Sequence, residues 1–431
     1  GHQGDLNDKS DSCVNEISAQ GGAVEKPPSL FHDPDFMKIW MAGAMVGIMR
    51  WLDVLVVGYY TLVLTNSPFI VSLMLFMRML PMFLLGAFAG ALAERLDRRV
   101  VLVILLTLMT GMYATLATLA ILEKLELWHV ALGVIYSGVF WSFELPVRRT
   151  MVGDIAGSLR LPRAMGLESA TNSITRALGP LAGGALYDTV GIQGAFGLGV
   201  VVCLIGAILL STVKRGARSE GFVRAPMLTG FLEGAAYIRK ERVVQAVLVV
   251  TIILNLFGFA CVSMYSVIGR ESFGMSASET GLLASTEGFG AFCGALLVAT
   301  FAKSSQLPRI FVIGAGTNIA SMGLFAAMGL LGEHGLVLAA AAFLFLAGFG
   351  LSGFGSMQSG LVLTRTPPHM RVRVMGVLAM CIGCGPLGIL NVGWIAEEIG
   401  AAAAVITVTS IGFCCFLVAN LFYPELRRRL T

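Results

Sequence analysis

Charged and amide side chains lie inside long apolar stretches of this sequence, where they could carry protons or bind a polar ligand. A charge in hydrocarbon costs at least about 2.5 kcal/mol, so such residues persist mainly where they form pairs or line a cavity. We therefore treat the whole set as candidates for proton coupling or substrate binding. Its members are Arg50, Asp53, Arg78, Glu144, Glu168, Asn172, Arg176, Asn255, Glu287 and Gln358.

Asp53 is the first candidate for a proton carrier or a substrate contact. It lies three residues after Arg50 and therefore on the same face of a helix. A permanent structural pair between Asp53 and Arg50 is an equally open alternative. Arg78 and Glu287 lie deep in two other apolar segments, so each needs a partner from another helix, and the two could face one cavity. Glu144, near the end of its segment, is a weaker candidate.

A polar stripe runs along one further apolar segment, because Glu168, Asn172 and Arg176 recur every four residues. Such a stripe should face protein or water, either as part of a substrate and proton path or as a buried network between helices. Asn255 and Gln358 could give uncharged hydrogen bonds to a ligand. Aromatic residues could add apolar contacts, although packing or lipid contact is their more common role: Trp40, Trp51, Trp141, Phe257 and Phe354.

The composition places these residues in an integral membrane protein. The 431 residues are 56% apolar and 13% charged, with a mean hydropathy of +0.81, which excludes a water-soluble fold. Apolar runs of about 20 residues or more can each cross a hydrocarbon core of roughly 30 Å. We predict twelve such helices, at 36–64, 68–93, 99–123, 127–149, 164–188, 191–213, 241–268, 278–302, 308–332, 335–364, 372–396 and 400–424.

The basic residues orient these helices, since Lys and Arg stay mainly on the cytoplasmic side. With both termini in the cytoplasm, 25 of the 30 Lys and Arg residues fall in cytoplasmic segments. The net charge of +4 thus reports topology and gives no reason to expect nucleic acid. The first 29 residues contain no apolar run, so we expect neither a cleavable signal nor a span there.

An internal repeat divides the predicted helices into two sets of six. The segment Gly86-Ala-Phe-Ala-Gly90-Ala-Leu92 matches Gly290-Ala-Phe-Cys-Gly294-Ala-Leu296 at six of seven positions, 204 residues later. A second match, 206 residues apart, pairs Gly179-Pro180 with Gly385-Pro386, which we interpret as a hinge in the second half. Parallel six-helix repeats are a transporter architecture, in which the substrate site lies between the halves near the bilayer midplane.

The predicted domains follow from this repeat and from the longest basic connection in the chain. We predict an all-α membrane fold with two pseudo-symmetric six-helix bundles. Its parts are a mobile cytoplasmic tail (1–35), a first bundle (36–213), a cytoplasmic linker (214–240), a second bundle (241–424) and a C-terminal tail (425–431).

The loop after the second predicted helix resembles the signature loop of the major facilitator superfamily, Gly-x-x-x-Asp-Arg-x-Gly-Arg-Arg/Lys. The matching residues are Gly90, Glu94, Arg95, Asp97, Arg98 and Arg99. Glu94 keeps the charge of the family's acid, whereas Asp97 replaces its second glycine and puts the tight turn of the family in question. The resemblance implies a gating role for this loop, in locking the cytoplasmic faces of the two halves together. A simple positive-inside loop is the alternative.

A second resemblance concerns the fifth predicted helix. Its residues Gly179, Pro180, Gly183 and Gly184 resemble the antiporter motif of the superfamily's exporters, although Thr175 stands where that motif usually has a glycine. The stretch from Glu144 through Leu167 is similar to the macrolide-efflux-like and siderophore-exporter-like proton antiporters. The resemblance implies the major facilitator fold, export coupled to protons, and a bacterial inner membrane.

Several functions are disfavoured by missing motifs. The sequence has no Gly-x-x-x-x-Gly-Lys-Ser/Thr segment for ATP phosphates, and its apolar Cys381 and Cys384 lack further metal ligands nearby. We expect no cofactor, no metal and no enzymatic activity. The leading hypothesis is a monomeric, proton-coupled exporter of an amphipathic small molecule by alternating access. The alternatives are a symporter or facilitator for a metabolite, and a sensor or scaffold with a transporter fold.

Overall fold

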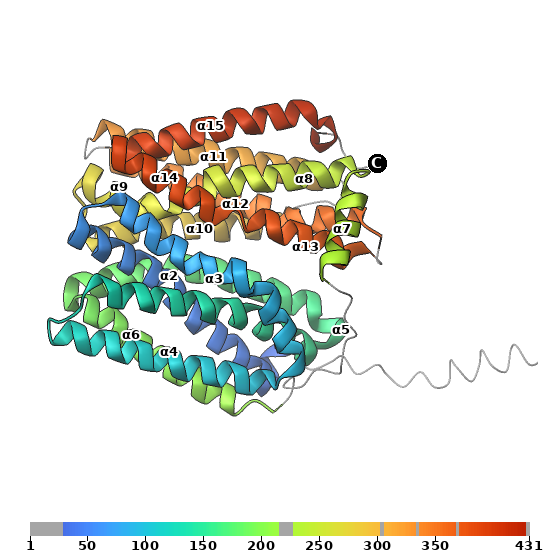
Figure 1. The fold of residues 1–431 in the computed structure, drawn as a ribbon. Coiled ribbons are helices and arrows are strands. Elements are labelled where there is room, and N and C mark those ends of the chain that lie inside the picture. The colour runs from blue at the N-terminus through green and yellow to red at the C-terminus, as the bar shows by residue number, and fades with distance from the viewer. Residues whose placement is uncertain (1–28, 215–226, 302–305, 333–335, 368–369, 428–431) are drawn as a thin grey trace, which may run out of the picture.

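The computed structural model describes residues 29–214, 227–301, 306–332, 336–367 and 370–427, and all its regular elements in these ranges are helices (Figure 1). Most of the predicted N-terminal tail and residues 428–431 lie outside this part. The described chain begins with a turn at Leu30–His32, and the carboxylate of Asp33 accepts hydrogen bonds from the first N–H groups of the first long helix. That helix therefore begins at Pro34, slightly before the predicted start.

The helices form two bundles that lie side by side (Figure 1). The N-terminal half contains α2 (Pro34–Thr65), α3 (Pro68–Arg95), α4 (Arg98–Ile121), α5 (Leu127–Val190) and α6 (Ile192–Ser211). The short helix α7 (Met227–Ile238) follows, inside the predicted linker. The C-terminal half contains α8 (Arg242–Ile253), α9 (Tyr265–Phe273), α10 (Ala277–Phe301), α11 (Leu307–Leu331), α12 (Val337–Arg365), α13 (Arg371–Ile382), α14 (Gly385–Ile399) and α15 (Ala401–Phe422).

The helical bundle has two ends, called the near end and the far end. The near end carries Pro34, α7 and the described C-terminus, whereas the far end carries the α2–α3, α9–α10 and α14–α15 connections (Figure 1). Eleven described segments are long and apolar enough to span a membrane. The predicted fifth span, 164–188, is not among them: it is helical, but its polar stripe lowers its hydropathy. The multi-pass membrane fold is confirmed, while the count of twelve stays a prediction.

The largest departure from the predicted boundaries is α5, which joins the predicted fourth and fifth spans. The helix continues beyond residue 149 and is interrupted at Gly157, whose φ of 70° and ψ of 171° are not helical. This backbone conformation strongly favours glycine. The chain reverses there at the near end, so both parts of α5 run between the two ends of the bundle.

The predicted seventh and eleventh spans are irregular, in contrast to the unbroken α2. Between α8 and α9 the backbone adopts a π-helical turn (Leu254–Gly258) and a 3-10 stretch (Phe259–Met264). Between α13 and α14 the helix breaks at Gly383 and Cys384, immediately before Gly385 and Pro386. Mid-helix segments of this kind often mark places where a helix can bend.

Each half has its own apolar core, and a third core joins the halves. One buried cluster runs from Leu30 to Val213 and contains only residues of the N-terminal half. A second, from Ile238 to Leu426, contains only residues outside that half. The third combines Leu55 and Val71 with residues of α9, α10 and α14. The two halves can therefore retain their own packing while their relative position changes.

Glycines bring helix backbones into direct contact in the C-terminal half. A methyl group added to Gly290 would collide with the carbonyl oxygen of Phe345 in α12, and one added to Gly294 would lie 2.8 Å from the carbonyl oxygen of Phe349. Small residues at this spacing permit such close packing in membranes. The side chains of the first copy of the motif, at 86–92, lie outside the described part of the chain.

We predict that Gly290→Ala lowers the stability of the protein, because the added methyl group meets backbone that cannot rotate away. Overpacking of this kind costs about 1–3 kcal/mol. The matched control is Gly197→Ala in α6, where no atom lies within 4 Å of the added group. Thermal unfolding in detergent should show a midpoint several degrees lower for Gly290→Ala only; equal midpoints for the two variants would contradict this packing argument.

Candidate substrate and proton site

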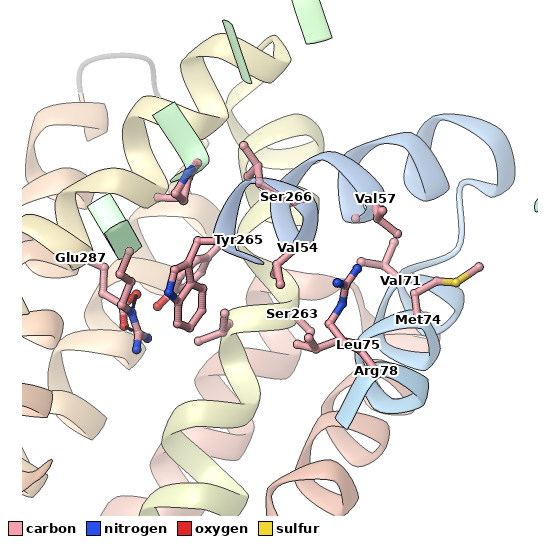
Figure 2. Close-up of a pocket in the computed structure, with 17 residues that line it drawn as sticks. Val54, Val57, Val71, Met74, Leu75, Arg78, Ser263, Tyr265, Ser266 and Glu287 are labelled. Atoms are coloured by element: carbon pink, nitrogen blue, oxygen red, sulfur yellow. Dashed lines mark hydrogen bonds and ion pairs between the residues drawn. The ribbon is translucent and has the colours of Figure 1, made fainter. Parts of the chain in front are cut away.

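A cavity lies between the two halves, with about 610 Å³ of free space including the open solvent at its mouth. Its walls come from α2, α3 and α5 on one side and from the 3-10 stretch, α9 and α10 on the other. Most of the lining is apolar, and Figure 2 shows Arg78 and Glu287 on opposite sides with Tyr265 and Ser263 between them. Arg78 and Glu287 therefore face one cavity, as the sequence suggested.

Asp53 pairs with Arg78, not with Arg50. The Asp53 Oδ2 atom lies 2.5 Å from Arg78 Nη1, and both side chains are buried. The predicted alternative of an Arg50–Asp53 pair is wrong, because α3 brings Arg78 alongside Asp53 while Arg50 finds its partner in α5. Arg78 also lies over the ring of Trp141, 5.4 Å from its centre, a favourable cation–π arrangement.

A chain of four alternating charges occupies the N-terminal half nearer its near end. Arg50 Nη2 donates to Glu144 at 2.9 Å, Arg148 Nε donates to Glu144 at 2.5 Å, and Arg148 Nη1 donates to Glu168 at 2.6 Å. The chain ties α2 to both parts of α5. Glu144, the weaker candidate by sequence, is thus one of its two inner members. Arg148 was missed as a site residue, although its position one helical turn after Glu144 indicated a pair.

Arg176 and Glu287 form an ion pair that joins the two halves. Arg176 Nη2 donates to Glu287 Oε1 at 2.8 Å and Arg176 Nε to Glu287 Oε2 at 3.1 Å, so the contact is bidentate. Both residues line the cavity. Trp51, on the same wall, lies under the guanidinium at 4.6 Å. Other ion pairs of the described residues, such as Arg50–Glu144, Asp53–Arg78 and Arg242–Glu425, lie within one half.

The predicted amide candidates do not line this cavity. Asn255 Nδ2 donates to the Thr251 carbonyl oxygen at 2.9 Å, and Gln358 Nε2 donates to the Thr251 hydroxyl at 2.7 Å. These contacts stay within the C-terminal half. The polar stripe of α5 divides as well, because Glu168 and Arg176 form ion pairs whereas the Asn172 side chain has no hydrogen bond to a described residue. Of the five aromatic candidates, Trp51 alone lines the cavity.

The predicted gating loop makes contacts within the N-terminal half in this conformation. The Asp97 carboxylate accepts hydrogen bonds from the N–H groups of Arg99 (3.0 Å) and Val100 (3.3 Å), and so caps α4. Arg98 pairs with Asp154, and Arg99 donates to the Val213 carbonyl oxygen at 2.8 Å. The side chains of Gly90, Glu94 and Arg95 lie outside the described residues, so the gating role stays a prediction.

The glycine motif of α5 lets two other helices approach closely. Added methyl groups at Gly179 and Gly183 would meet α2 at Trp51 Cβ (2.6 Å) and Leu52 Cγ (3.0 Å). One at Gly184 would collide with the start of α10 at Ala277. The motif thus positions α5 against a helix of each half. Its counterpart, Gly385 and Pro386, opens α14 and does not line the cavity.

Comparison with known proteins identifies the class. The chain resembles an uncharacterised MFS-type transporter, YfiS, of Bacillus subtilis, with 24% identity covering 88% of this chain and 91% of the relative. Macrolide efflux protein A of Streptococcus pyogenes is 20% identical, covering 85% and 90%. The enterobactin exporter EntS of Shigella boydii is 23% identical, covering 92% and 93%.

A solved structure shares the fold. The inward-facing, unoccupied bacterial homologue of the lysosomal transporter Spinster superposes with a TM-score of 0.67 at 15% identity, covering 91% of this chain and 98% of that one. This likeness, at 15% identity, shows the fold alone. The family model described as "Transmembrane secretion effector", a family of the major facilitator superfamily of transporters, matches residues 27–428, and the chain belongs to that family. It is a transporter and not an enzyme.

We predict that the Asp53–Arg78 pair can be demonstrated by rescue of stability. Asp53→Asn leaves Arg78 buried without its partner, a loss of about 3–5 kcal/mol for a buried pair. Adding Arg78→Met should recover part of that loss, because the uncompensated charge is removed. The matched control adds Arg50→Met, which deprives Glu144 of a partner and should not rescue. Apparent melting temperatures measure this, and rescue by Arg50→Met alone would contradict the pairing.

Proposed function

We propose that this protein exports an amphipathic small molecule from the cytoplasm in exchange for protons. The observation that carries the proposal is the largely apolar cavity between the halves, with the Arg176–Glu287 pair across it. An apolar cavity with a few convergent polar groups is the usual form of a small-molecule site. A site between two repeats can be exposed to each side of the membrane in turn.

Protonation of Glu287 provides the coupling step. The ionised carboxylate neutralises Arg176 across the interface, whereas the protonated group no longer does so. The free energy that holds the two halves together at this level therefore depends on one proton. A proton that enters along a potential of 100 mV releases about 2.3 kcal/mol, which can drive the export of a neutral molecule. Asp53, paired with Arg78 inside one half, is the second candidate for the coupling acid.

The relatives and the distribution of charges support export as the direction of transport. Two relatives are described as an efflux protein and an exporter, and the α5 glycine motif resembles that of exporters. The bias of Lys and Arg toward the near end favours a cytoplasmic near end and an external far end. A bacterial inner membrane with both termini in the cytoplasm is the location that fits these features.

In this conformation the two halves are held together on the far side of the cavity. Several polar contacts between described residues join the halves. They lie at the level of Arg176–Glu287 or closer to the far end, as do Ser72–Ser263 (3.1 Å) and Tyr59–Met275 (3.1 Å). With the far end outside, this is a state closed to the exterior. Transport requires these contacts to open while the near end closes.

A symporter or facilitator for a metabolite is the second candidate function. It would use the same cavity and the same ion pairs but move substrate and proton in one direction. A sensor or scaffold with this fold would need neither. The direction of proton movement separates the first alternative from export, and the absence of any substrate-evoked flux separates the second.

We predict that Glu287→Gln strongly lowers substrate-evoked proton flux. The purified protein is placed in sealed vesicles with a pH-sensitive dye, a proton gradient is imposed, and antibiotics, dyes and siderophore-like compounds are screened. The wild type should show proton influx coupled to substrate export, and Glu287→Gln should lower it at least about tenfold. Glu398→Gln, at the exposed far end of α14, is the matched control and should transport normally.

Other results of the same assay would contradict the role of Glu287 or the exchange of substrate for protons. Wild-type flux in Glu287→Gln together with loss in Asp53→Asn would move the coupling role to Asp53. Protons that travel in the same direction as the substrate would establish a symporter. Substrate movement without any proton flux would establish a facilitator.

A further inference from the structure

Two carboxylates at the far end each bind the first turn of a helix from the opposite half. Asp188, near the end of α5, accepts a hydrogen bond from the backbone N–H of Ser278 at 2.7 Å, at the start of α10. Glu397, near the end of α14, accepts hydrogen bonds from the backbone N–H of Phe69 at 3.2 Å and from the Ser67 hydroxyl at 2.7 Å, at the start of α3.

The two contacts lie at corresponding helix ends of the two halves, at an offset slightly longer than the 204 and 206 residues of the two sequence matches. Asp188 and Glu397 are 209 residues apart, as are Phe69 and Ser278. The serine before each helix repeats with the same offset: the Ser67 hydroxyl accepts from the N–H of Ile70, and the Ser276 hydroxyl accepts from the N–H of Glu279, both at 3.3 Å. In α3 and in α10, the third N–H group therefore donates to a serine hydroxyl of the same half, and the second N–H group donates to a carboxylate of the opposite half.

Small residues allow this approach at both places. The hydroxyl of Ser278 donates to the carbonyl oxygen of Gly184 at 3.1 Å, and a methyl group at Gly184 would collide with Ala277. The equivalent glycine, Gly393, is again 209 residues later, and a methyl group there would collide with Ser72 in α3. The end of α5 therefore packs directly against the start of α10, and the end of α14 packs directly against the start of α3.

The energetics follow from the chemistry of helix ends. The first N–H groups of a helix have no partner within the helix, and the helix dipole places partial positive charge there. A carboxylate that accepts such an N–H is a strong cap. Here the cap belongs to the other half, so it exists only while the far end is closed. Asp188 and Glu397 are themselves exposed, and water can replace both partners when the halves separate.

We propose that Asp188 and Glu397 are positioning residues of transport: a symmetric pair of inter-half helix caps that holds the far end closed. The proposal rests on the proposed function in taking this closure as one state of the transport cycle. Neither residue lines the cavity, so their contribution is to the balance between the two states. Tyr59, which donates to the Met275 carbonyl oxygen and lies under Arg270, adds a separate contact that the caps do not need.

The test measures opening of the far end directly. In a background without native cysteines, Ser266→Cys places a thiol on the far-end wall of the cavity, at a position that is 5% exposed. A membrane-impermeant maleimide is applied from the far-end side of oriented vesicles, and the labelling rate is measured without substrate. Removal of a helix cap typically changes an equilibrium about fivefold. We expect Asp188→Ala and Glu397→Ala each to raise the labelling rate about fivefold, and the double variant to raise it further.

Matched controls keep the result specific to the caps. Glu398→Ala removes the neighbouring carboxylate of α14, which has no hydrogen bond to a described residue, and should label at the parent rate. Asp188→Asn with Glu397→Gln keeps the acceptor oxygens and should label more slowly than the double alanine variant. A double alanine variant with the parent rate, or an equal increase in Glu398→Ala, would overturn the proposal. Circular dichroism confirms that each variant is folded.

The labelling experiment and the transport assay can refute the two proposals independently. Faster labelling of the cap variants in a protein that transports nothing would refute the proposed function and support the caps. Normal transport by the parent protein with unchanged labelling in the cap variants would refute the caps and leave the proposed function intact.

Discussion

The neutralisation of charge inside hydrocarbon is the constraint on which this structure depends. Four arginines and four acids lie within apolar helices, and each is held in an ion pair. Three of the acids belong to the N-terminal half, and the fourth, Glu287, belongs to the C-terminal half. Leaving one of them alone would cost several kcal/mol. Within the N-terminal half these pairs fix α2, α3 and α5 relative to one another. The Arg176–Glu287 pair crosses to the other half. The free energy of holding the halves in this relative position therefore depends on the charges of these two side chains.

The two halves share one arrangement of helices but differ in where they carry buried charges and irregular backbone. In the N-terminal half, buried ion pairs join the helices and α2 is unbroken. The C-terminal half contributes Glu287 to the central ion pair and has irregular backbone in the segments between α8 and α9 and between α13 and α14. A π-helical turn and a helix break supply local freedom without unpacking a core. The movement of such a molecule need not be a symmetric rocking of equal bodies, since one half can bend while the other rotates as a unit.

The sequence predicts the membrane fold, the repeat and most of the charged residues, but only part of their pairing. Hydropathy and spacing depend on the local chain, so the helices and the face shared by Arg50 and Asp53 follow directly. Which arginine reaches Asp53 depends on how α3 and α5 pack, and spacing within one helix contains no such information. The Glu144–Arg148 contact was predictable because both residues lie one turn apart on one helix. The hydrogen bond from Gln358 to the Thr251 hydroxyl likewise depends on how two helices pack, whereas the bond from Asn255 to the Thr251 carbonyl oxygen spans one helical turn.

The residue at position 97 has a consequence for how this loop is recognised in other sequences. Asp97 stands where the superfamily's pattern has glycine, yet its φ of −64° and ψ of 111° are accessible to any amino acid. Its carboxylate caps α4, a role that serine, threonine and asparagine also fill well. A search pattern that demands glycine here would reject chains with the same backbone. A pattern that accepts any helix-capping residue would describe the geometry of the loop and recover divergent members that a fixed consensus omits.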